Sequence, residues 1–187
     1  MRIENTGSAP NYANVLTLAE LKQHLRVTHT AEDTLIEALR DAACHYVEGY
    51  CNTQLTSRTA KAYLAGFRSA AFPVGPVTAI SSVDYQTTSD TTELTELSES
   101  NYYYHLDTQP AVIDWINAPS FYQYTRYPVV ISFTYGYSSA PDPIVHAVRL
   151  LAAHLYENRQ QVVDRNSVQI QMGVHAMLAQ FRHIVQP

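Results

Sequence analysis

VISFTYGYSSAPDPIVHAVRLLAAHLYENR, residues 130–159, is the stretch that says most about the fold. Its first part alternates apolar and polar residues, and this alternation predicts a half-buried strand over 127–137. Asp142 and Pro143 follow as an N-cap and a proline at the first helical position, the favoured pair at a helix start. Apolar residues then recur at three- and four-residue spacing, which predicts a helix to about Asn158.

Two further helices are predicted in the N-terminal third of the chain. A capping box at Thr17 begins a short helix. A longer helix is expected from Thr30 to about Cys51, because two acidic residues in its first turn suit the helix dipole and apolar residues recur at helical spacing. Residues 1–16 show no such period, so we expect them to form a flexible arm.

Between these helices the period of the sequence changes to two residues, which predicts strands. The strands expected at 102–106 and 111–116 would pair as a hairpin. The expected strands lie at 59–65, 77–85, 102–106 and 111–116, with a long, exposed, acidic loop at 86–100.

The C-terminal part shows a short alternation at Val168, Ile170 and Met172, so we expect an extended segment there, ended by Gly173 before a last short helix. The fold class predicted from the whole pattern is α+β: a small helical bundle, with three main helices plus a C-terminal helix, and an inserted antiparallel β subdomain. The expected organisation is a flexible N-terminal arm at 1–16, a helical core at 17–57 and 138–163, a β-rich insertion at 58–137 with an acidic loop at 86–100, and a C-terminal segment at 164–187.

Charge is distributed unevenly along the chain. The net charge is −5, yet residues 69–125 contain seven acidic side chains and no Lys or Arg. Such a block repels nucleic acid rather than binding it. No apolar run approaches 18 residues, so no membrane span is expected, and the N-terminus lacks the apolar core of a signal peptide. On one helix Cys44 and Cys51 would lie roughly 10 Å apart, too far for a disulfide. These features indicate an intracellular origin.

Motifs of catalysis and of cofactor binding are missing. The eight histidines form no HExxH motif and no pair at metal-ligand spacing. There is no GxSxG nucleophile motif, and six unclustered glycines provide no phosphate-binding loop. We therefore expect no enzyme, no cofactor and no metal site.

Eight of the fourteen tyrosines lie in the second half of the expected insertion, at positions 102–104, 122, 124, 127, 135 and 137. Tyrosine joins a large apolar body to a polar tip, so such a group suits half-buried strands, a protein interface or a carbohydrate platform. A platform for single-stranded nucleic acid would need basic companions, and the acidic block has none.

Four segments, in their order and spacing, resemble the head–tail connector (adaptor, head-completion) proteins of tailed phages. The resemblance covers roughly residues 16–185, although Gln180 stands where a proline is frequent in that family. Its motifs are LTLAELKQHL (16–25) with the helix after Asp33, PVGPV (73–77) leading to a strand, YGY (135–137) with Pro143 and LYENR (155–159), and GVHAML (173–178) with Phe181 and Arg182.

The resemblance implies a structural virion protein, assembled in the host cytoplasm and located at the neck. It implies a homo-oligomeric ring of about twelve copies that docks on the portal protein, extends the DNA channel and offers an attachment surface for a stopper or tail protein. Packaged DNA would pass through without specific binding. In relatives the C-terminal segment inserts against the portal, which carries over here to Val168, Ile170, Met172, Val174, Met177, Leu178, Phe181 and Arg182.

An acidic loop in such a ring would line the channel or face the tail, and it corresponds here to Asp90, Glu93, Glu96 and Glu99. Two other functions are compatible with the residues. One is another virion ring protein, such as a stopper or a tail terminator, although the capped helices argue against these mainly β proteins. The other is a tyrosine-rich module that binds carbohydrates or surfaces.

Overall fold

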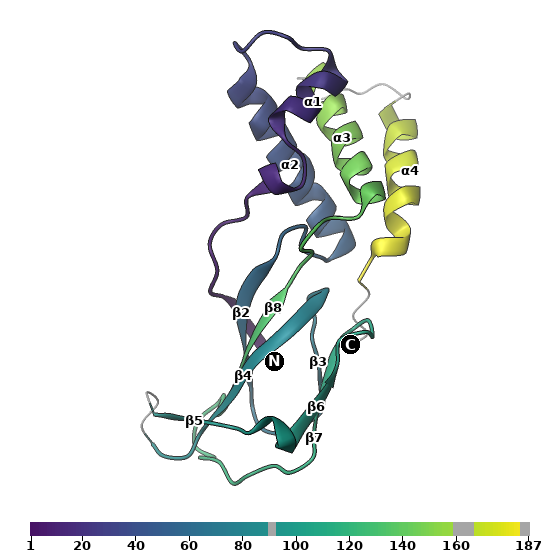
Figure 1. Cartoon of the computed structure of the whole chain (residues 1–187). Coiled ribbons are helices and arrows are strands. Elements are labelled where there is room, and N and C mark those ends of the chain that lie inside the picture. The colour runs from purple at the N-terminus through teal and green to yellow at the C-terminus, as the bar shows by residue number, and fades with distance from the viewer. Residues whose placement is uncertain (90–92, 159–166, 184–187) are drawn as a thin grey trace. The chain divides into compact units, whose positions relative to one another are not determined.

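The computed structural model describes residues 1–89, 93–158 and 167–183, and for 167–172 it gives the course of the backbone alone (Figure 1). The described chain divides into two compact units. The helical unit comprises residues 10–56 and 138–183, and the β unit comprises residues 1–9 and 57–137. The predicted α+β fold class, with helices and antiparallel sheets, is confirmed.

Four helices form most of the helical unit: α1 (Leu18–Leu25), α2 (Asp33–Cys51), α3 (Asp142–Glu157) and α4 (Ser167–Leu178), with short 3-10 turns at η1 (Tyr12–Asn14) and η3 (Ala179–Phe181). Helix α3 packs against the other three. Its apolar stripe is buried, and fully buried residues such as Ile144, Val148 and, on α2, Ile36 contribute about 1.5–3 kcal/mol each through removal from water. None of the described helices is both long and apolar enough to cross a membrane.

The start of α1 is the predicted capping box. The Thr17 hydroxyl accepts a hydrogen bond from the Glu20 backbone N–H, and the Glu20 carboxylate accepts one from the Thr17 backbone N–H at 2.9 Å. The helix starts of α2 and α3 differ by one to three residues from those expected. Asp142 is the first residue of α3 rather than its cap, and the N-cap Pro141 has no side chain that could accept a hydrogen bond.

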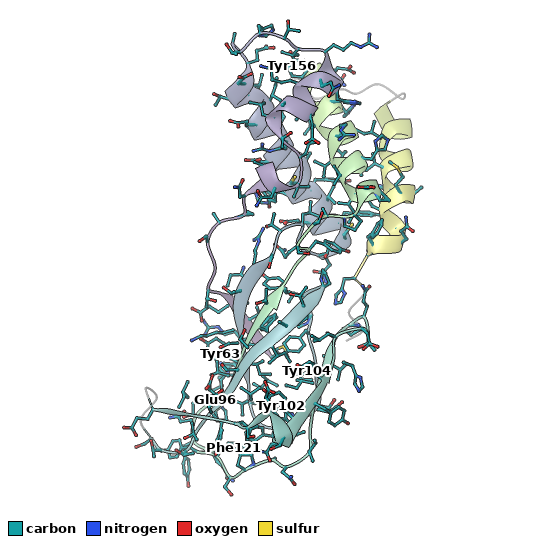
Figure 2. All side chains as sticks on the ribbon, viewed as in Figure 1. Tyr63, Glu96, Tyr102, Tyr104, Phe121 and Tyr156 are labelled. Carbon is teal, nitrogen blue, oxygen red and sulfur yellow. The ribbon has the colours of Figure 1, made fainter. Side chains whose placement is uncertain are left out.

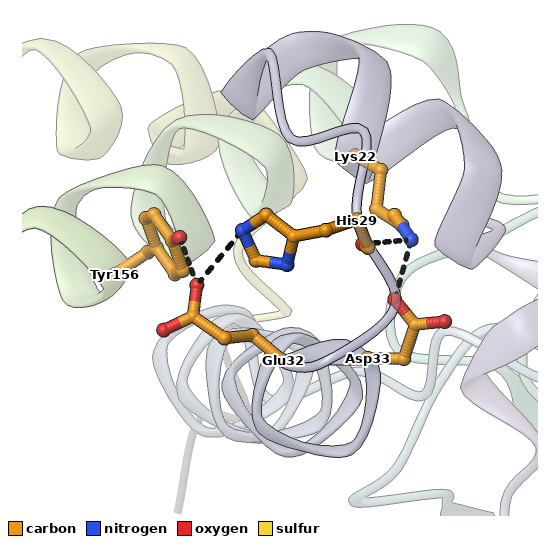
Figure 3. Close-up of polar contacts among 5 residues, drawn as sticks. All are labelled: Lys22, His29, Glu32, Asp33 and Tyr156. Atoms are coloured by element: carbon orange, nitrogen blue, oxygen red, sulfur yellow. Dashed lines mark hydrogen bonds and ion pairs between the residues drawn. The ribbon is translucent and has the colours of Figure 1, made fainter.

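Polar contacts join α1, α2 and α3 at one end of the helical unit (Figure 3). Lys22 on α1 donates to the backbone oxygen of His29 at 2.7 Å and to the carboxylate of Asp33, the first residue of α2. The Tyr156 hydroxyl, near the end of α3, donates to the Glu32 carboxylate. These bonds fix the connection between α1 and α2 against α3.

Two antiparallel sheets form the β unit. The five-stranded sheet has the order β1-β2-β8-β4-β5 and the three-stranded sheet the order β3-β7-β6. Phe72, which follows β3, and Phe133 on β8 are both buried, with ring centroids 4.8 Å apart. The strands are β1 (Arg2–Asn5), β2 (Arg58–Leu64), β3 (Ala70–Ala71), β4 (Val77–Gln86), β5 (Leu94–Glu96), β6 (Tyr102–His105), β7 (Val112–Trp115) and β8 (Val129–Tyr135), with a 3-10 turn η2 (Glu99–Asn101) before β6.

Several strand predictions are confirmed. Residues Ile131, Phe133 and Tyr135 on β8 are buried while the residues between them are less so, as the alternation required. Strands β6 and β7 pair as the expected hairpin.

The N-terminal segment differs from the flexible arm expected for residues 1–16. Residues 2–5 form β1, which pairs antiparallel with β2, and Tyr12, Val15 and Leu16 are buried in the helical unit. Four residues are too few to show a period, so only the pairing with β2 reveals this strand.

The expected loop at 86–100 also contains regular structure. Residues 94–96 form β5 on the edge of the large sheet, 99–101 form η2, and Leu97 between them is buried. The surrounding Thr, Ser and Glu residues hide a three-residue strand because strand propensity depends more on the neighbouring strand than on the residue itself.

The extended segment expected at 168–172, ended by Gly173, is wrong. The backbone is helical from Ser167 to Leu178, and Gly173 lies inside α4. A five-residue alternation also satisfies the i, i+4 spacing of a helix, so period alone does not decide so short a run. Glycine inside a helix costs about 1 kcal/mol relative to alanine and does not necessarily end it.

Candidate interaction surfaces

The cysteines of this protein are not poised for chemistry. Cys44 and Cys51 are both free and buried. Burial raises the pKa of Cys44 to about 12 and that of Cys51 to about 11, so both stay protonated thiols near neutral pH. Across the described residues, no group of three His, Cys, Asp or Glu side chains is arranged to hold a metal ion.

The C-terminal segment packs on the end of α2 within the same chain. The His183 backbone N–H donates to the Cys51 backbone oxygen at 2.7 Å, and the Asn52 side-chain amide donates to the His183 backbone oxygen at 3.3 Å. Asn52 has a left-handed backbone (φ 51°), the usual conformation of a residue that ends a helix. The end of α2 is thus covered by residues about 130 positions further along the chain.

An aromatic stack reinforces this packing. The His175 ring on α4 lies parallel to that of Tyr50, with centroids 4.5 Å apart, and its Nε2 is 2.7 Å from the Tyr46 hydroxyl. The Arg182 guanidinium also lies over the Tyr50 ring, 5.1 Å from its centre. Tyr46 and Tyr50 are one helical turn apart on α2, so both reach the same face of α4.

The residues expected to contact the portal fall into three groups. Val174 and Leu178 are buried in the core of the helical unit, with exposed fractions of 1% and 0%. Met177 and Phe181 are half-buried and Arg182 is exposed, so these three remain available on the surface. The side chains of Val168, Ile170 and Met172 lie outside the described residues.

A groove of about 540 Å³ runs beside α4 in the helical unit. Its walls carry both apolar side chains and three histidines, His24, His146 and His154. Met177 also lines it, together with Leu150. The groove extends the exposed surface around Met177 and mixes apolar contact area with hydrogen-bonding groups.

The expected acidic surface is present where it is described. Glu93, Glu96 and Glu99 are exposed, and Asp90 lies outside the described residues. Antiparallel pairing of β4 with β5 places Asp84 directly opposite Glu96. Burial, followed by the negative charges of Glu99, Glu96 and Asp84, raises the pKa of Tyr102.

The register of the large sheet creates a row that the linear sequence does not show. Paired residues from its five strands follow one another as Arg2, Tyr63, Val130, Asp84 and Glu96, and we call them the cross-sheet row. Because paired residues share a face of the sheet, the row has a basic end on β1 and an acidic end on β5. Figure 2 labels Tyr63 and Glu96 on the ribbon.

Further basic and aromatic side chains surround the basic end. The Arg2 guanidinium lies 5.5 Å from the Tyr63 ring centre, and the Arg126 guanidinium lies 5.3 Å from that of Tyr127. The two tyrosine rings are 6.5 Å apart. Lys61 is exposed two residues before Tyr63 and therefore lies on the same face. We call Arg2, Lys61, Tyr63, Arg126 and Tyr127 the basic–aromatic patch.

The exposed tyrosines of β6 do not make a flat carbohydrate platform. Tyr103 and Tyr104 are 47% and 42% exposed, but neighbouring residues of a strand point to opposite faces. Tyr102 shares the face of Tyr104 and is buried. The two exposed rings therefore present two separate contacts.

Sequence reasoning missed the basic–aromatic patch because its members come from distant segments. The acidic block is continuous in the sequence, whereas only folding brings Arg2 and Lys61 beside the tyrosines at positions 63 and 127. The Lys61-x-Tyr63 spacing was a local signal, since two residues apart on a strand means one face. The contact of His175 with α2 had a weaker signal in the sequence, namely the spacing of Tyr46 and Tyr50 by one helical turn.

Residues 15–104 match the family model of phage gp6-like head-tail connector proteins. The resemblance to head–tail connector proteins is therefore confirmed over these residues.

Solved structures agree on the fold. The chain is similar to a chain in the neck of an empty gene transfer agent particle with C6 symmetry, at 24% identity and a TM-score of 0.79, covering 100% of this chain and 98% of that one. It is also similar to a chain in the native particle's virion (24%, TM-score 0.78) and to one in the native neck with C12 symmetry (22%, TM-score 0.75), with the same coverage. No protein with a curated description matches the sequence.

Proposed function

We propose that this chain forms a ring of about twelve copies at the neck of a virion, docks on the portal protein and extends the DNA channel toward a stopper or tail protein. The observation that carries this proposal is the family match over residues 15–104, together with a fold shared along its whole length with neck proteins. The C12 symmetry of one of those necks supports the copy number.

The portal-facing surface would be the exposed part of the C-terminal segment. Met177 lies on α4, Phe181 ends η3 and Arg182 follows it, and Met177 also lines the groove beside α4. An apolar residue beside a groove and an exposed arginine are typical anchors of a protein interface. Val174 and Leu178 would support this surface from inside the helical unit rather than contact the portal.

The acidic residues would give the ring a negative surface toward DNA or the tail. Asp90, Glu93 and Glu99 repeated around a ring would repel the phosphate backbone, so that DNA passes without binding. Glu96 belongs to the same acidic group, and it also forms the acidic end of the cross-sheet row with Asp84.

The proposal is tested by mixing the purified chain with the portal protein of the same phage. Mass photometry and electron microscopy should show closed rings of about twelve copies seated on the portal. Met177→Glu places a charge in the proposed contact and should lower the affinity for the portal at least about tenfold. Leu155→Glu is the matched control, since Leu155 is an apolar residue of α3 that is 36% exposed.

Circular dichroism checks that both variants are folded. Portal binding that is equal for wild type and Met177→Glu would reject this surface as the docking site. A wild-type chain that stays monomeric with and without portal would reject the ring itself.

A further inference from the structure

We propose that the basic–aromatic patch is the docking surface for a second copy of this chain, and that it receives the Asp84–Glu96 end of that copy's five-stranded sheet. This inference rests on the proposed ring and names the faces that would join its subunits. In a ring, each subunit meets its neighbours through two different surfaces, which must be complementary to each other.

The cross-sheet row supplies two such surfaces. It begins at Arg2 on β1 and ends at Glu96 on β5, at opposite edges of one sheet. Four strand spacings separate these edges, so the charged ends lie about 19 Å apart. This distance is about twice the Debye length at physiological salt, so the two ends do not neutralise each other within one subunit.

The acidic end brings two carboxylates close together. Asp84 and Glu96 face each other across the β4–β5 ladder, where like charges are unfavourable. Among the described residues, neither carboxylate forms an ion pair, and Asp84 accepts a hydrogen bond from the Ser82 hydroxyl at 2.8 Å. A cation from another chain would relieve this repulsion.

The basic end is positively charged, and tyrosine rings hold its arginine side chains in place. Arg2 and Arg126 rest on the rings of Tyr63 and Tyr127, which hold the guanidinium groups on an apolar surface. Lys61 adds a third cation on the same face.

Among the described residues, one acidic neighbour faces this patch. Glu4 is paired in register with Lys61 and lies 3.4 Å from Arg2, but both members of that ion pair are exposed and hold each other weakly. Three cations and one carboxylate leave the patch with an excess of positive charge, which fits a partner that brings two carboxylates.

A second copy fits this patch better than nucleic acid does. Tyrosine rings beside cations are also found in surfaces that bind single strands. However, the same β unit carries the acidic block of residues 69–125, whose field opposes a polyanion. The acidic end of a neighbouring sheet brings two carboxylates only, and its row would continue the row of the first copy from edge to edge.

The test uses two full-length variants with opposite charge changes. Lys61→Glu with Arg126→Glu makes the basic–aromatic patch acidic like the Asp84–Glu96 end, and Asp84→Lys with Glu96→Lys makes that end basic like the patch. Each variant alone should lose ring formation, with the association between copies weakened at least about tenfold by like-charge contact. An equimolar mixture should recover rings in which the two variants alternate.

Mass photometry measures the rings, with the portal protein present if the wild type needs it, and native mass spectrometry of variants with different tags measures the alternation. Asp107→Lys, an exposed acid in the β6–β7 turn, is the charge control and should form rings as the wild type does. Fluorescence of Trp115, the single tryptophan, confirms that the β unit is folded.

Rings from either double variant alone, or a mixture that fails to assemble where the wild type assembles, would overturn this inference while leaving the ring intact. Normal rings from the Lys61→Glu, Arg126→Glu variant with lost binding of a labelled oligonucleotide would also overturn it, and would make the patch a nucleic-acid surface. A wild type without rings under any of these conditions would instead refute the proposed function.

Discussion

Replacing Leu178 by alanine tests whether the C-terminal segment is packed on its own subunit in solution. Leu178 is fully buried at the end of α4, and its backbone oxygen lies near the Cys51 thiol on α2. Leucine-to-alanine changes at fully buried sites cost about 2–5 kcal/mol, because the transfer free energy is lost and a cavity remains. We expect a loss of about 3 kcal/mol in the free energy of unfolding of the helical unit.

The two units can be followed separately during urea unfolding. Circular dichroism at 222 nm reports mainly on the helical unit, and fluorescence of Trp115 reports on the β unit. With an m-value of about 1–2 kcal/mol/M for a unit of this size, Leu178→Ala should lower the dichroism midpoint by about 1.5–3 M. The Trp115 midpoint should move much less if the units unfold independently.

The matched control is Leu155→Ala on α3, where the leucine is partly exposed and its loss should cost under about 1 kcal/mol. Equal, small effects of the two variants would refute the reasoning, since α4 would then be undocked in the free subunit. In that case Leu178 would be available to the portal, as the sequence resemblance implied.

Three further changes test other parts of the structure. Thr17→Ala removes the cap of α1 and should cost about 1 kcal/mol of the helical unit's stability, measured by the same urea titration. Tyr156→Phe removes the hydrogen bond to Glu32 and should cost about 1–2 kcal/mol, and an unchanged midpoint would mean that this bond to the start of α2 is not formed in solution. Cys44 and Cys51 should resist a thiol reagent at neutral pH until urea unfolds the chain, and rapid labelling of the native protein would contradict their burial.

The sequence predicts those elements that have a long periodic pattern or two residues that confirm each other's role. The α1 start could be predicted because Thr17 and Glu20 satisfy each other's backbone donors, and β8 because its alternation runs over many residues. Strands β1 and β5 could not, because three or four residues carry no measurable period. Their existence depends on the neighbouring strands that they pair with.

The same physical reason limited the prediction of surfaces. The acidic residues are neighbours in sequence, so composition alone reveals them. The basic–aromatic patch depends on the pairing of β1 with β2 and on the turn before β8, which join residues more than 60 positions apart. The helix at 167–172 was mistaken for a strand because five residues fit both periods.

The burial of Val174 and Leu178 bears on how this chain would bind a portal in the proposed ring. Releasing both side chains from the helical unit would forgo about 3–6 kcal/mol of burial in each subunit before any new contact forms. Docking through Met177, Phe181 and Arg182, with α4 kept in place, avoids this loss. In a ring of about twelve copies each contact can be weak, because the other subunits hold the ring against the portal and raise the effective concentration of every site. A shallow surface repeated many times is therefore energetically sufficient, and insertion of the buried face of α4 is not required.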